Sequence, residues 1–85
     1  SEDDKSAVSK LESLFNEAIK GKTTTTDAWA EAKPHWVEAC VTANQQATKR
    51  GVKEIPISGY TSPAAGVDAL GKLIGRLVAY DIQAS

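Results

Sequence analysis

Apolar residues recur with the period of an α-helix in three segments, and this pattern constrains the fold of the chain more than any other feature. They fall at positions i, i+3, i+4 and i+7 in residues 4–20, and the same period returns in residues 27–50 and 63–83. The first stripe comprises Val8, Leu11, Phe15, Ala18 and Ile19, with Leu14 at its margin. The sequence therefore predicts an all-α fold, a three-helix bundle.

Residues that end or begin helices mark the limits of these segments. Gly21 and Gly51 stand just beyond the first and second segments, where glycine commonly ends a helix. Thr61 or Ser62 can cap the third helix, and Pro63 suits its first position, where a missing amide hydrogen leaves no bond unmade.

Pro34 interrupts the second segment, because proline removes a backbone hydrogen bond and collides with the preceding turn. We expect the helix to be kinked at Pro34, or to break into residues 27–32 and 34–50. Trp29 and Trp36 bracket this point on one face, which also carries Cys40, Ala43 and Ala47. Paired tryptophans in so small a domain more often anchor a core than line a pocket, and both interpretations are kept.

Residues 51–62, GVKEIPISGYTS, cannot continue the helix because Pro56 and Gly59 interrupt them. The proline also favours an extended backbone at the residue before it. Apolar side chains are nevertheless frequent here: Val52, Ile55, Ile57 and Tyr60. We expect a long extended connection that crosses the bundle and covers one end of its core.

The third segment is apolar over more of its circumference than a single contact needs. Its main stripe comprises Val67, Leu70, Ile74, Leu77 and Val78, and only Asp68, Lys72, Arg76 and Gln83 form a clear polar strip. Gly71 and Gly75 lie one turn apart, although each costs a helix about 0.5–1 kcal/mol relative to alanine. Small residues at this spacing predict a shallow groove for a bulky side chain, with Trp29 or Trp36 as the occupants expected within the chain.

Composition limits the classes of protein to which this chain can belong. The 85 residues predict a single helical domain over 1–85, and a net charge of −1 argues against a nucleic-acid partner. No apolar run approaches the roughly 20 residues of a membrane span. Cys40 has no cysteine partner and is expected to be a small buried hydrophobic residue. The chain begins with Ser1, which predicts a processed soluble product; no targeting segment is visible, and the compartment stays unknown.

Catalytic and metal-binding patterns are weak. Glu31, His35 and Glu38 could chelate a metal from one face of an unbroken helix, but Pro34 disturbs that geometry and a solvated polar face is preferred. His35 is the only histidine, and Cys40 lies about 140° from it around a helix. No nucleophile elbow, phosphate loop or zinc spacing occurs. We therefore expect no enzyme, catalytic residue, cofactor or metal.

Three binding functions stay open. The preferred hypothesis is a non-enzymatic helical protein–protein interaction module, a small subunit, adaptor or inhibitor that meets a protein partner or a second copy. Its expected interface comprises Ile55, Ile57, Tyr60, Gly71, Leu73, Gly75 and Tyr80. The first alternative is a small apolar-ligand binding protein that uses Trp29 and Trp36. The second is a helical DNA-binding regulator, for which residues 43–51 are the nearest match, although they carry no row of side chains suited to base edges.

Overall fold

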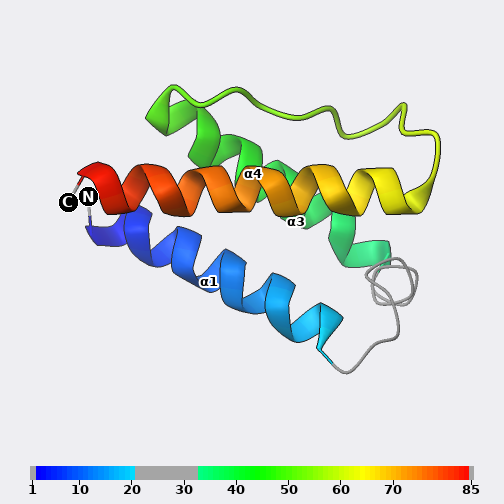
Figure 1. Ribbon diagram of the computed structural model, residues 1–85, viewed down its shortest axis with the longest axis horizontal. Helices are drawn as coiled ribbons and strands as arrows, with labels where there is room; N and C mark the ends of the chain where they lie inside the picture. Colours follow the sequence, from blue (N-terminus) through cyan, green and yellow to red (C-terminus); the bar gives the residue numbers. More distant parts are fainter. Residues whose placement is uncertain (1, 21–32, 85) are drawn as a thin grey trace.

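Three helices make up the described part of the chain, which in the computed structural model comprises residues 2–20 and 33–84. They are α1 (Glu2–Ile19), α3 (Lys33–Arg50) and α4 (Pro63–Ala84). Each packs against the other two, and Figure 1 shows α4 running along the molecule with α1 on one side and residues 51–62 on the other. The predicted three-helix, all-α architecture is confirmed. None of the described helices is long and apolar enough to cross a membrane.

Side chains of unequal size fill the core. To this core α4 supplies mainly large apolar residues and α3 mainly small ones. The buried residues are Val8 and Leu11 of α1; Ala39, Cys40, Ala43 and Ala47 of α3; and Val67, Leu70, Leu73, Ile74 and Leu77 of α4. Phe15 and Trp36 pack against this core from its edge.

The glycines of α4 meet different neighbours. A methyl group built on Gly66 would lie 2.8 Å from Cζ2 of Trp36, whereas one on Gly71 would lie 3.1 Å from Cζ of Phe15. One on Gly75 would meet nothing within 4 Å among the described contacts. The prediction that Trp36 fills a groove at Gly71 and Gly75 is wrong, because the Gly71 flank of α4 faces α1 and Trp36 lies one turn earlier, at Gly66. Trp29, the other expected occupant, lies outside the described residues.

The ends of α3 and α4 follow the sequence signals. Gly51 adopts a φ of 70°, and the amide groups of Gly51 and Val52 donate to the carbonyls of Thr48 and Ala47. This pair of bonds is a Schellman motif, which needs a residue tolerant of positive φ. At α4, the amide of Ala65 donates to the Ser62 hydroxyl, which identifies Ser62 as the N-cap and places Pro63 at the first helical position.

Pro34 lies in the first turn of α3. Residues 27–32 are outside the described part of the chain, as is the side chain of His35, so the kink at Pro34 and the metal hypothesis for Glu31 and His35 stay predictions.

Residues 51–62 join α3 to α4 without helix or strand and return along the bundle (Figure 1). The side chain of Asn44 in α3 holds this connection to the helix through two hydrogen bonds with Ile55. Its Nδ2 donates to the Ile55 carbonyl at 2.8 Å, and its Oδ1 accepts from the Ile55 amide at 2.9 Å. One buried amide side chain thus satisfies both backbone groups of Ile55, as a neighbouring strand would.

A second polar contact joins the C-terminal ends of α3 and α4. Arg50 Nε and Nη2 donate to the two carboxylate oxygens of Asp81, at 2.8 and 3.0 Å. Arg50 Nη1 also donates to the backbone and side-chain oxygens of Gln46. The Arg50 and Asp81 side chains are only 5% and 15% exposed, so this bidentate pair is largely withdrawn from water.

Candidate ligand pocket

The seven residues of the expected interface do not form one surface. Leu73 is fully buried in the core, and its assignment to an interface is wrong because the α4 flank that carries it packs into the bundle. Ile57 and Tyr60 line a pocket near the start of α4, whereas Tyr80 lies about 25 Å further along that helix at 1.5 Å per residue.

The other three members are also dispersed. Ile55 is partly buried and held by Asn44. Gly71 lies under Phe15, and Gly75 is exposed beside no described side chain. What these residues share in the sequence, an apolar character outside the main stripe, does not place them together in space.

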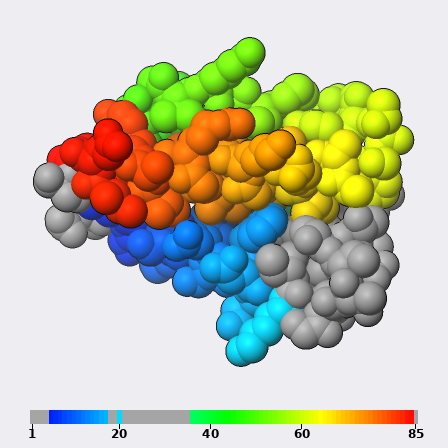
Figure 2. All heavy atoms as spheres, in the orientation of Figure 1, coloured from blue at the N-terminus to red at the C-terminus, as the bar shows by residue number. Residues whose placement is uncertain are grey.

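A pocket of about 610 Å³ lies where α3, the connection and α4 meet. Its described lining consists of Trp36 from α3, residues 57–62 from the connection, and Pro63, Gly66 and Val67 from α4. In Figure 2 the end of the connection and the start of α4, in yellow, gather at one end of the molecule. Trp36 and residues from the segment 57–67, which are distant in sequence, therefore line one hollow.

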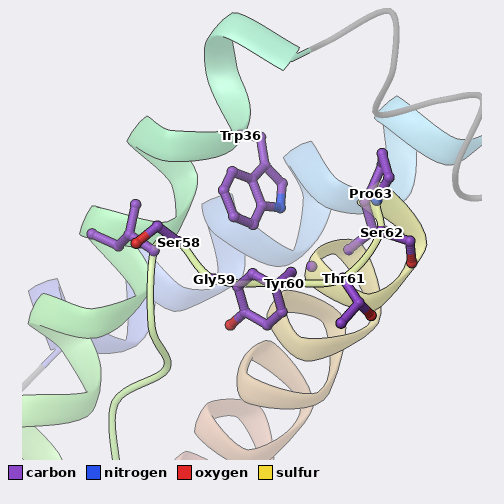
Figure 3. A pocket seen from close by; sticks show the side chains of 10 residues that line it. Trp36, Ser58, Gly59, Tyr60, Thr61, Ser62 and Pro63 are labelled. Carbon is purple, nitrogen blue, oxygen red and sulfur yellow. The ribbon is translucent and has the colours of Figure 1, made fainter.

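Trp36 and Tyr60 form the aromatic part of this lining. Their ring centroids are 5.9 Å apart and their planes meet at 84°, an edge-to-face arrangement. Figure 3 shows the indole reaching from α3 toward the segment that carries Tyr60. The Tyr60 hydroxyl donates to the carbonyl of Pro56 at 2.7 Å, which fixes the phenol ring on the connection. Desolvation raises the pKa of Tyr60 and favours this neutral, hydrogen-donating form.

The indole Nε1–H of Trp36 is buried and has no hydrogen-bond partner among the described residues. It belongs to the ring edge that packs on Gly66, since Cζ2 and Cε2 are the atoms closest to that glycine. A buried donor without an acceptor costs about 1–3 kcal/mol, and such groups are rare in folded proteins. The group has almost no accessible surface, so it lies behind the pocket wall and does not face the open volume.

The described lining of the pocket carries no charged side chain, and its polar side chains are the hydroxyls of Ser58, Tyr60, Thr61 and Ser62. Within residues 2–20 and 33–84, no group of three or more potential metal ligands is found. The described lining thus combines apolar and aromatic surface with hydroxyl groups.

Cys40 lies in the core one turn after Trp36 and is not exposed. Burial raises the pKa of its thiol to about 11, so the group stays protonated at neutral pH and is a poor nucleophile. The expectation of a small buried hydrophobic residue is confirmed.

Three polar residues within residues 43–51, the stretch considered for DNA binding, make contacts inside the bundle. Asn44 and Gln46 are buried, and Arg50 is engaged with Asp81. These polar residues are turned toward the bundle, where base edges cannot reach them.

Sequence reasoning named Trp36 as a possible pocket residue but missed its neighbours. The sequence assigns no role to Gly66, and it marks Ser58, Thr61 and Ser62 only as loop or cap residues. Their proximity depends on how the connection folds back, which no local spacing encodes. Searches against protein-family models, curated proteins and solved structures found no match for this chain.

Proposed function

We propose that this protein is a binding module that holds a small, mainly apolar molecule in the pocket that Trp36 and Tyr60 line together. The observation that carries the proposal is the pocket itself, whose volume of about 610 Å³ falls within the range of about 300–1,000 Å³ typical of small-molecule sites. Such sites combine apolar and aromatic walls with a few polar groups, and the described lining has this composition.

The pocket is also held in place from several sides. The Tyr60–Pro56 bond orients the phenol, the Asn44–Ile55 pair secures the connection, and the Ser62 cap begins α4 beside it. A site built on fixed elements loses less conformational entropy when a ligand binds, and this supports binding in the absence of a large rearrangement.

Nuclear magnetic resonance tests the proposal on the full chain. Trp29→Phe leaves Trp36 as the only tryptophan, so its indole N–H gives one assignable signal. Small neutral and charged apolar molecules, aromatic and aliphatic, are titrated against this protein. We expect at least one to shift the Trp36 indole signal and the Tyr60 and Gly66 amide signals saturably.

Two tyrosines provide a matched pair of variants. Tyr60→Ala removes a wall of the pocket and should abolish the saturable shift, whereas Tyr80→Ala removes an exposed tyrosine near the other end of α4 and should preserve it. Absence of a saturable shift with every compound, or a shift that survives Tyr60→Ala, contradicts the proposed function.

A second candidate function, the protein-interaction module, is favoured by one observation. Val37 and Val41 are exposed one turn apart on α3, and Val41 lines a shallow hollow together with exposed Ile57. These three residues suggest a contact strip on α3 and the connection in place of the α4 flank. Size-exclusion chromatography with light scattering tests self-association; a dimer dispersed by Val41→Lys would support this candidate, and a monomer at all concentrations would oppose self-association.

A further inference from the structure

The shallow hollow beside Val41, called the second hollow from here on, has a volume of about 530 Å³ and adjoins the pocket. Ile57 belongs to the lining of both, so the two hollows meet at this exposed side chain. Along α3 they extend together from Trp36 to Lys49, a rise of about 20 Å at 1.5 Å per residue. A ligand that occupies both hollows is therefore long and narrow.

The two hollows differ in chemistry. The pocket presents apolar and aromatic side chains, among them Trp36, Tyr60 and Val67. In the described lining of the second hollow only Val41 and Ile57 are apolar. Its other described residues carry polar or charged side chains: Asn44, Gln45, Gln46, Thr48, Lys49 and Glu54. A molecule that is apolar at one end and polar at the other matches this division.

The charges of the second hollow oppose each other. Lys49 and Glu54 are the charged residues of its described lining, and both are exposed. The Thr48 hydroxyl donates to a carboxylate oxygen of Glu54, which orients this carboxylate beside α3. An anionic head group attracted by Lys49 is also repelled by Glu54, and a cationic head group meets the reverse. An uncharged head group with hydroxyls can accept from the ammonium and donate to the carboxylate.

We infer that this protein binds a single-chain amphiphile with an uncharged, hydroxyl-bearing head group, whose chain lies in the pocket and whose head group lies in the second hollow. The inference rests on the proposed function and specifies its ligand class. The proposed function requires only that an apolar molecule binds in the pocket, whereas the inference also requires a contribution from the second hollow.

Four probes separate chain length from head-group charge. Monodecanoylglycerol has a long chain and an uncharged diol head; monobutanoylglycerol keeps this head on a short chain; and decanoate and decyltrimethylammonium keep the long chain with an anionic or a cationic head. Each probe is titrated into the full chain below the concentration at which it forms micelles, and binding is followed through backbone amide signals.

We expect monodecanoylglycerol to bind roughly tenfold or more tightly than its short-chain analogue, because more apolar surface is buried. It should bind roughly threefold or more tightly than the two charged probes, because each of these meets a like charge in the second hollow. The amide signals of Tyr60 and Gly66 should report the chain in the pocket. Those of Gln45 and Glu54 should shift with the same affinity and report the head group.

Two variants with the same change of net charge test where the head group lies. Glu54→Lys leaves the described lining of the second hollow with positive charges only, so the affinity for decanoate should rise roughly threefold or more relative to that for monodecanoylglycerol. Glu12→Lys changes an exposed glutamate of α1, outside the described lining of both hollows, and should leave this ratio unchanged. A cooperative thermal transition shows that each variant is folded.

The outcomes are distinguishable. If monodecanoylglycerol shifts only the pocket signals, if a charged probe binds as tightly, or if Glu54→Lys and Glu12→Lys act equally on decanoate, the ligand class is wrong while the pocket function stands. If the Gln45 and Glu54 signals change with protein concentration in the absence of a probe, the second hollow belongs to a contact between two copies and the inference is also wrong. If neither these probes nor any of the apolar molecules titrated for the proposed function binds in the pocket, that function fails and the inference with it.

Discussion

Three glycines on one helix show how far the environment of a residue departs from its type. Gly66, Gly71 and Gly75 share the helical conformation of α4, but their Cα atoms face an indole, a phenyl ring and open space. The sequence grouped Gly71 with Gly75 because they lie 40° apart on a helical wheel at 100° per residue. A wheel gives direction around an axis, and it does not tell which neighbouring side chain lies over each position: Phe15 lies over Gly71, and nothing described lies within 4 Å of a methyl group on Gly75.

Gly75→Ala should stabilise the protein. Its methyl group meets nothing within 4 Å, and alanine favours a helix over glycine by about 0.5–1 kcal/mol. We expect the free energy of unfolding in urea to rise by about that amount, with an unchanged dependence on denaturant concentration. A loss of stability would mean that another group occupies the space beside Gly75.

Gly66→Ala should have the opposite effect, although the helix preference is the same. The new methyl group would lie 2.8 Å from Trp36 Cζ2, so the indole or α3 must shift. Overpacking of this kind costs about 1–3 kcal/mol, more than the helix gains. We expect lower stability in urea and a displaced Trp36 indole signal. Stability equal to that of Gly75→Ala would show that the indole moves aside freely.

At the scale of the elements, the sequence predicted the helices and their ends because the signals are local. Gly51, Ser62 and Pro63 act within one turn of the boundaries that they mark. The partners of Asn44 and Arg50 lie 11 and 31 residues away. In the sequence these two residues resemble the exposed Gln45 and Lys49 beside them, so their structural roles could not be recognised.

Asn44→Ala tests whether this long-range pair holds the connection. The variant leaves the partly buried amide and carbonyl of Ile55 without partners, at a cost of about 1–3 kcal/mol. We expect reduced stability and faster hydrogen exchange at the Ile55 amide. Gln45→Ala, at the exposed neighbouring position, should change the free energy of unfolding by no more than about 0.5 kcal/mol and should leave the exchange rate of the Ile55 amide unchanged. Equal exchange rates in the two variants would refute the role of Asn44.

At the scale of the whole molecule, the candidate site is a product of assembly. Its described lining comes from α3, the connection and α4, and periodicity describes each of these segments separately. The sequence could therefore suggest a tryptophan pocket without identifying Tyr60, Gly66 or the hydroxyl residues as its neighbours. The same limitation placed Leu73 at an interface, since the breadth of an apolar arc does not reveal which part the bundle covers.

The Arg50–Asp81 pair joins the far ends of α3 and α4, and it should make the stability of the assembly depend on pH. Hydrogen bonds from Arg50 hold the pKa of Asp81 below its ordinary value. The folded protein consequently binds fewer protons than the unfolded chain at acidic pH. The stabilisation is complete above the ordinary aspartate pKa of about 4 and is lost as the pH falls through the lower pKa of the folded state.

Asp81→Asn removes the charge with little change of shape and should cost about 1.5–3 kcal/mol at pH 7, the range for a hydrogen bond to a charged group. Because the parent protein loses the same interaction when Asp81 is protonated, the two unfolding free energies should converge as the pH is lowered from 5 to below 3, measured by urea titration at each pH. Asp68→Asn is the matched control: Asp68 pairs with Lys72 on the exposed face of α4, where an ion pair contributes at most about 0.5 kcal/mol. A difference between Asp81→Asn and the parent that stays constant across this pH range would mean that the carboxylate charge of Asp81 does not stabilise the junction of α3 and α4.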